Sequence, residues 1–153
     1  MPDVRLCSAL GSLLLFSCAA AEPLPAGWHR IDLGPFSMTL PTELKSVPVR
    51  AIDSYVGEFA APEMKIHFDY GDWSDPLTSS YGEVLAKEKI RISDREALVV
   101  TWRRTDGSPS PILSAVHFPA RWKEDALLTV YADLKEEAAV GSARRIFDSI
   151  RFR

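Results

Sequence analysis

The sequence predicts an α+β fold, with an antiparallel sheet of about six to eight strands flanked by helices and a C-terminal amphipathic helix. Short segments that alternate apolar and polar residues recur between turn residues, as in antiparallel strands. Near the C-terminus, apolar residues instead recur every three or four positions, as on one face of a helix. The chain has 153 residues, which is enough for one domain.

The domain is expected to begin with a hairpin. Residues 28–33 and 36–40 both alternate, and Gly34-Pro35 between them is a turn signal. Pro41 ends the second strand, because proline cannot donate to a strand ladder. Residues 42–50 are then expected to form a loop.

The middle of the chain is expected to contain two strands and a short helix. Residues 52–59 are strand-like, with Gly57 as a candidate bulge. Residues 64–70 alternate most clearly of all. A polar loop bracketed by Gly71 and Pro76 follows, and residues 78–86 are assigned to a short helix.

Four further strands and a helix complete the domain. Residues 89–92 and 97–104 are expected to pair across a turn, and residues 112–118 and 127–133 continue the antiparallel meander. Residues 135–148 form the predicted helix, whose apolar stripe should cover one face of the sheet. The stripe consists of Ala139, Val140, Ala143, Ile146, Phe147 and Ile150.

The N-terminus has the order of an export signal. Residues 1–21 contain one basic residue, Arg5, an apolar stretch and then small residues. Ala19-Ala20-Ala21 fits cleavage after Ala21, whereas residues 15–18 resemble a bacterial lipobox, which would place a lipid on Cys18. The lipoprotein is favoured slightly, and a short buried helix is the alternative without export. A Pro-rich linker at 22–27 precedes the single domain at 28–153.

Charge and cysteine content exclude several functions. The formal charge is −3, which argues against nucleic acid as an electrostatic partner. Both cysteines, Cys7 and Cys18, lie in the export segment, so the domain has no thiolate nucleophile, disulfide or cysteine-based metal site. No cofactor is expected, and contact with a membrane is expected only through a lipid on Cys18.

Several segments together suggest a family. FSMTLP (36–41), IDSYVGEF (52–59), HFDYGDWSD (67–75) and ARRIFDSIRF (143–152) occur in this order. The chain resembles bacterial envelope proteins of the Mog1/PsbP-like kind over about residues 28–153. The resemblance implies an antiparallel sheet flanked by helices. Members include a Ran-binding nuclear transport factor, a photosystem subunit and bacterial accessory proteins, so it implies a fold rather than a function.

The loop at 69–76 carries the main candidate for binding. Asp69, Asp72 and Asp75 form a D-x-x-D-x-x-D run, interleaved with Tyr70 and Trp73. Oxygen ligands on a loop suit a hard cation such as calcium, but the EF-hand spacing is absent. An Asp-rich turn is the plainer interpretation. As a recognition surface, Tyr70, Asp72, Trp73 and Asp75 would supply the contacts.

Other polar motifs are weaker. His67 and Asp69 are two apart on one strand and therefore share a face, as a general base or metal ligand pair would. The simpler interpretation is the solvent face of a half-buried strand. Residues 102–104 and 121–123 combine tryptophan with basic residues, which we interpret as Arg stems packed on indoles. The arginines of residues 144–153 are interpreted as a solvated helix end that would touch anionic headgroups near a lipid anchor.

The sequence leaves three functional hypotheses. The leading one is a non-catalytic binding or accessory protein, periplasmic or tethered to the outer membrane, whose partner is another envelope protein. The second is an inhibitor or immunity-type lipoprotein that blocks an envelope-acting enzyme through a loop such as 69–76. The third is a metal-assisted enzyme that uses His67 and the nearby aspartates, although no catalytic motif is present.

Overall fold

The computed structural model describes residues 23–120 and 126–153. The export segment with Cys18 and the basic–aromatic motif at 121–123 lie outside these residues. In chain order the described elements are β1 (Trp28–Asp32), β2 (Phe36–Pro41), β3 (Lys45–Val47), β4 (Tyr55–Ala60), β5 (Met64–Gly71), β6 (Glu83–Ile92), β7 (Arg95–Arg103), β8 (Ile112–Phe118), β9 (Leu127–Leu134), a 3-10 turn (Glu137–Ala139), α1 (Val140–Asp148) and β10 (Arg151–Phe152).

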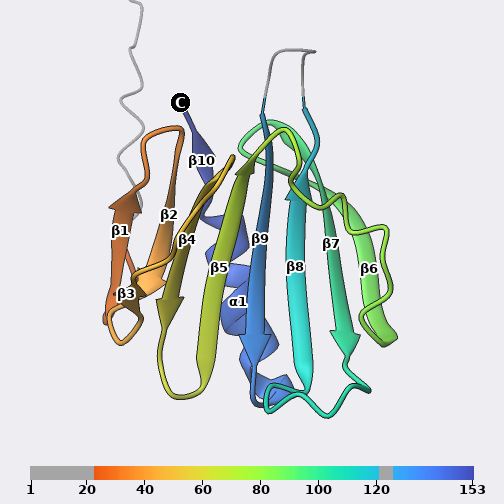
Figure 1. Ribbon diagram of the computed structural model, residues 1–153. Coiled ribbons are helices and arrows are strands. Elements are labelled where there is room, and N and C mark those ends of the chain that lie inside the picture. Colours follow the sequence, from red (N-terminus) through yellow and green to blue (C-terminus); the bar gives the residue numbers. More distant parts are fainter. Residues whose placement is uncertain (1–22, 121–125) are drawn as a thin grey trace, which may run out of the picture.

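Seven strands form one antiparallel sheet in the order β3-β4-β5-β9-β8-β7-β6 (Figure 1). Strands β6 to β9 pair with their neighbours in sequence, which confirms the predicted meander. β9 then pairs with β5 in an antiparallel register that sets His67 opposite Tyr131. This long-range pairing places β5 and β9 at the centre of the sheet.

The predicted N-terminal hairpin is present but belongs to a second, three-stranded sheet. β1 pairs with β2, and β10 pairs with the other side of β2. The sequence predicts only one sheet, because the two residues of β10 are too few to show an alternating pattern. Phe36, Met38 and Leu40 of β2 are completely buried, so this small sheet closes part of the core.

The main core lies between the large sheet and α1, which Figure 1 shows behind the sheet. Ala143, Ile146 and Phe147 are the buried residues of α1, which confirms the predicted apolar stripe. They pack with inward residues of the central strands, such as Ile66 and Val130. The opposite side of the large sheet is therefore left for other groups, and we call it the open face.

The helix is shorter than predicted. α1 begins at Val140 rather than near Lys135, and residues 137–139 form a 3-10 turn. The backbone N–H of Lys135 still donates to Glu63 O at 3.2 Å, next to the β4–β5 turn, so the chain is held in the strand direction there. No side chain caps the start of α1. Within the described residues this is the single α-helix, where the sequence predicts flanking helices.

The predicted helix at 78–86 is wrong. Leu77 has a φ of 57° and Gly82 a φ of 141°, which a continuous right-handed helix does not contain. β6 begins at Glu83 and pairs with β7 along most of its length. Pairing with the neighbouring strand has overridden the local preference of this segment.

The predicted strand at 52–59 begins only at Tyr55, and Ile52 is 98% exposed. Gly57 is not a bulge, since it keeps regular register opposite Phe68. A Cβ at position 57 would lie 2.3 Å from Phe68 Cε1, so the glycine makes room for a buried ring. The register irregularity of the large sheet lies in β6, between Val84 and Ala86.

Candidate functional site

Several polar side chains of the central strands point to the open face, and most of them are buried there. Alternation along β5, β8 and β9 directs the apolar residues to the main core and the residues between them to the open face. The latter include His67, His117, Thr129, Tyr131 and Asp133, of which all but His67 are buried. These groups need partners, because a buried polar group without a hydrogen bond is costly.

Residues 72–82, the cover loop, supply many of these partners. The loop runs from the end of β5 across the sheet to β6 at the far edge, as the yellow-green segment of Figure 1. Leu77 and Tyr81 pack on a second apolar cluster that includes Trp102 of β7 and Leu113 of β8. The Tyr81 and Trp102 rings meet edge to face at 5.1 Å. The cover loop thus covers part of the open face.

Asp75 fastens the cover loop to the sheet. Its carboxylate accepts a hydrogen bond from the Leu77 N–H at 2.8 Å, from the Tyr131 hydroxyl at 2.9 Å and from the Tyr81 hydroxyl. Burial raises the pKa of Asp75, but the hydrogen bonds from Tyr81, Tyr131 and Leu77 outweigh it, so the net pKa lies below the usual 3.8. Burial and the nearby carboxylate raise the pKa of both tyrosines. Both hydroxyls therefore keep their protons at neutral pH.

A second set of hydrogen bonds, centred on Thr129, joins the cover loop to the sheet beside Asp75. Thr129 Oγ1 donates to Asp75 O at 2.7 Å and lies 2.7 Å from Ser74 Oγ and 2.8 Å from His117 Nδ1. Because the single Thr129 proton goes to a carbonyl, which cannot donate, His117 must donate from Nδ1. Burial lowers the pKa of His117, so the ring is neutral at pH 7. Asp75 and Ser74 together hold the loop at two adjacent residues.

A groove opens beside the cover loop, with a volume of about 530 Å³. In it, the His67 ring stacks on the Tyr131 ring at 4.5 Å. His67 Nδ1 lies 3.6 Å from Asp133 Oδ2, and Arg104 Nη1 lies 2.7 Å from Asp133 Oδ1. Burial lowers the pKa of His67, and the Asp133 carboxylate only partly opposes this. Arg104, Asp133 and His67 thus form a chain of paired polar groups.

These two histidines make stability depend on pH. Their folded pKa values lie below the ordinary 6.5, so the unfolded chain binds more protons as the pH falls through 6.5. Stability, measured by the urea midpoint, should therefore decrease as the pH falls through 6.5 toward the lower folded pKa values. The double variant His67→Gln/His117→Gln should lose most of this dependence. An equally steep pH dependence in the double variant would contradict the assignment.

The structure separates the four residues predicted to bind. Tyr70 faces the main core, where its ring lies 6.0 Å from that of Phe36. Asp75 is engaged with the two tyrosines, whereas Asp72 is exposed and Trp73 is 82% exposed. Of the predicted recognition surface, Asp72 and Trp73 are therefore the side chains that point outward.

His67 and Asp69 share a face as predicted, but the carboxylate near His67 belongs to Asp133 on β9. Asp69 Oδ1 is buried and has no hydrogen-bond partner among the described residues. Within residues 23–120 and 126–153, no three His, Cys, Asp or Glu side chains gather as metal ligands would. The sequence singles out Arg104 only as part of the motif at 102–104 and does not single out Asp133, because only the pairing of distant strands brings both residues to His67.

In the basic–aromatic motif at 102–104, the predicted packing of an Arg stem on the indole is wrong. Trp102 is buried against Tyr81 rather than beneath an arginine stem. Arg103 pairs with Glu83 at 3.1 Å and with Glu137 at 3.2 Å. These ion pairs connect β7 to its neighbour β6 and to the 3-10 turn.

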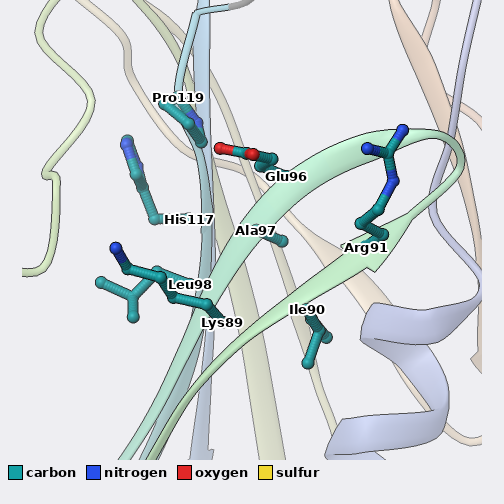
Figure 2. Close-up of a pocket in the computed structure, with 8 residues that line it drawn as sticks. All are labelled: Lys89, Ile90, Arg91, Glu96, Ala97, Leu98, His117 and Pro119. Atoms are coloured by element: carbon teal, nitrogen blue, oxygen red, sulfur yellow. The ribbon is translucent and has the colours of Figure 1, made fainter.

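A further cavity of about 600 Å³ lies at the β6–β7 hairpin. Figure 2 shows Lys89, Leu98 and His117 on one side of the hairpin ribbon, Ile90 on the other side, and Arg91 near the turn. The polar groups there do not converge on one point. The surface of the cover loop and its groove is the stronger candidate.

Comparison with protein-family models gives no match to this chain, and a search of curated proteins gives none either. In the part of the chain that the structure describes, there is no helix with the length and apolar character needed to cross a membrane. The function must therefore be argued from the site itself.

Proposed function

We propose that the protein is a non-catalytic binding or accessory protein of the bacterial envelope, and that it recognises another envelope protein through the cover loop. The observation that carries this proposal is that hydrogen-bonded residues and an exposed tryptophan are adjacent in the loop. Ser74 and Asp75 are bonded to the sheet, whereas the adjacent Trp73 is 82% exposed. An exposed tryptophan on a fixed backbone is a ready anchor, because little conformational freedom remains to be lost on binding.

A second exposed apolar side chain belongs to the segment that contacts Gly71, just before the cover loop. Gly71 contacts Ser54, since a Cβ at position 71 would lie 3.0 Å from Ser54 Oγ. Ile52 and Trp73 are each two residues from this contact, and they are the two most exposed large apolar side chains among the described residues. We call Ile52, Asp72 and Trp73 the recognition surface. Exposed apolar groups beside a carboxylate suit a protein partner better than a small polar ligand.

The non-catalytic part of the proposal is supported by the state of the polar groups on the open face. The Tyr81 and Tyr131 hydroxyls donate hydrogen bonds to Asp75, and His117 is hydrogen-bonded to Thr129. These hydrogen bonds hold the cover loop in place, so a structural role accounts for these polar groups.

The finer fold assignment and the location are also proposals. An antiparallel sheet backed by a C-terminal helix supports a Mog1/PsbP-like fold at the level of fold class. Export and a lipid on Cys18 rest on the order of residues 1–21 alone. Both are consistent with a periplasmic or outer-membrane-tethered role.

Trp73→Ala is the direct test of the proposed function. The tagged full chain would capture proteins from the membrane and periplasmic fractions of its native host, with mass spectrometry as the readout. We expect one dominant partner, held about 30-fold more weakly by Trp73→Ala, as for a tryptophan at the centre of an interface. The urea midpoint should not change, because the side chain is exposed.

Val84→Ala is the matched control, since Val84 is also an exposed apolar side chain but lies on the edge strand β6, beyond the end of the cover loop. It should capture the partner as the wild type does. Equal capture by Trp73→Ala and Val84→Ala would overturn the proposed role of the cover loop.

The exposed Trp73 on a pinned loop also favours a more specific version, an inhibitor or immunity-type lipoprotein that blocks an envelope-acting enzyme. A rigid projecting side chain suits insertion into an enzyme cleft. In that case the captured partner would be an enzyme, and an equimolar amount of the full chain would inhibit it. Trp73→Ala would then restore the activity of the enzyme.

A further inference from the structure

A groove of about 640 Å³ lies far from the cover loop, between β1–β2 and the C-terminal end of α1. We call its residues Trp28, Arg30, Thr39, Arg145 and Arg151 the cationic groove. Asp148, Ser149 and the linker residues 23–25 complete its walls. Arg30 and Thr39 are direct partners in the β1–β2 register and therefore share a face of the small sheet.

The three arginines of the cationic groove have no carboxylate partner among the described residues. Arg30 makes no hydrogen bond or ion pair there, and Arg145 lies over the Trp28 ring at 5.5 Å. Arg151 Nη1 donates only to carbonyl oxygens, those of residues 148 and 150 at 2.8 and 2.7 Å. By contrast, other arginines of the domain are paired with acids, namely Arg103, Arg104, Arg144 and Arg153.

The one acid in the groove, Asp148, already has a cationic partner outside the groove lining. Asp148 Oδ1 accepts a hydrogen bond from Arg144 Nε at 2.9 Å, and Arg144 also pairs with Glu88 on β6. Arg151 is bonded to the carbonyl at the helix end, where the dipole of α1 is negative, and so offsets it. The field inside the groove is therefore positive.

The wall contains a hydroxyl without a partner. Thr39 is only 4% exposed, and its Oγ1 has no hydrogen-bond partner in the described part of the chain. The backbone N–H of Thr39 donates to Ser149 Oγ at 2.8 Å, so the hydroxyl is the group of this residue that lacks a hydrogen-bond partner. A buried hydroxyl of this kind is usually paired, and a ligand oxygen at this wall would supply the acceptor.

We propose that the cationic groove binds a phosphate anion, carried as a monoester or diester. Guanidinium groups form paired, charge-assisted hydrogen bonds with phosphate oxygens, and three of them have donors to spare here. The half-buried Trp28 ring forms an apolar floor beside them. This site is separate from the proposed partner surface and stands without it.

Two sources of phosphate fit the groove: the headgroup of an anionic lipid and a soluble phosphate ester. Pro23 in the groove wall is five residues after Cys18, a distance of at most about 18 Å along the chain. If Cys18 carries a lipid, the groove would therefore lie within reach of headgroups. A soluble ester needs no such anchor, so the two sources call for separate probes.

The test compares the full-length chain with two triple variants. Arg30→Ala/Arg145→Ala/Arg151→Ala removes the cations of the groove. Arg50→Ala/Lys87→Ala/Lys89→Ala removes the same charge from exposed positions elsewhere on the domain. One arm titrates glycerol 3-phosphate by calorimetry, with glycerol as the blank. The other measures co-sedimentation with phosphatidylcholine vesicles that contain or lack phosphatidylglycerol.

We expect the groove variant to bind glycerol 3-phosphate about 100-fold more weakly, taking about fivefold for each cation. The matched variant should bind as the wild type does. If the wild type also binds phosphatidylglycerol vesicles and the groove variant alone loses this binding, the ligand is a lipid headgroup. If the wild type binds glycerol 3-phosphate but not the vesicles, the ligand is a soluble phosphate ester. Equal behaviour of the two triple variants, or no binding of either probe by the wild type, overturns the proposal.

Thr39→Val tests the wall without changing charge or size. Removal of an unpaired buried hydroxyl should leave the fold at least as stable as before. We expect its affinity for glycerol 3-phosphate to fall about fivefold, as for the loss of one hydrogen bond. Unchanged affinity would remove Thr39 from the site.

Discussion

Asp75→Ala is expected to destabilise the fold by about 3 kcal/mol, because it leaves the buried Tyr131 hydroxyl, the half-buried Tyr81 hydroxyl and the Leu77 N–H without their acceptor. The tyrosines cannot easily turn to water, since Tyr131 lies at the centre of the sheet beneath the cover loop. Urea denaturation at pH 7 measures the loss. The same variant should also weaken partner capture, because the loop is no longer held.

The pH dependence of this effect has a definite sign. The folded pKa of Asp75 lies below 3.8, so the stabilisation is complete above the unfolded pKa and is lost as the pH falls through the folded value. The wild type and Asp75→Ala should therefore become more alike below about pH 3.8. Asp72→Ala is the control, since that carboxylate is exposed, and it should change stability by less than about 0.5 kcal/mol. Equal effects of the two variants would contradict the account of the loop.

Gly82→Ala is expected to destabilise the fold by about 3 kcal/mol or more. Gly82 ends the cover loop with a φ of 141°, and a Cβ there would lie 2.2 Å from the carbonyl oxygen of Arg103. Because this neighbour is backbone, relief requires displacing the start of β6 from β7. Thermal and urea denaturation, read by circular dichroism, would detect the loss.

Gly107→Ala is the matched control. Gly107 also has a positive φ, of 74°, but nothing lies within 4 Å of a Cβ built there. Its substitution should cost only about 1 kcal/mol, the strain of the left-handed conformation alone. If Gly82→Ala were no more harmful than Gly107→Ala, the close approach to Arg103 would not be the reason for glycine at the loop end.

Much of the fold could be predicted from local patterns. The alternation in residues 64–70 and 112–118 gave strands close to β5 and β8, and the apolar stripe of residues 139–150 gave the buried face of α1. These patterns succeed because one side of each element is in the core and the other is not. The helix assigned to 78–86 failed because pairing with β7, rather than local preference, decides that segment.

The candidate site was predictable only in part. The run at 69–75 drew attention to the loop that lies on the open face, and Trp73 in that loop is exposed. The role of Asp75 was not visible, because its partner Tyr131 is 56 residues away and meets it only through the β5–β9 pairing. The sequence drew attention to Arg145 and Arg151 among the arginines of residues 144–153, but not to Arg30, because only the folding of β1 and β2 against the end of α1 brings Arg30 to them.

Photo-crosslinking from position 73 shows whether the cover loop touches a partner in the cell. The full chain would carry p-benzoylphenylalanine in place of Trp73 or, in a matched strain, in place of Val84, and would be irradiated in its native host. We expect one covalent product with a single envelope protein from position 73 and none from position 84. No product from position 73, or the same set of products from both positions, would contradict a recognition role for the cover loop.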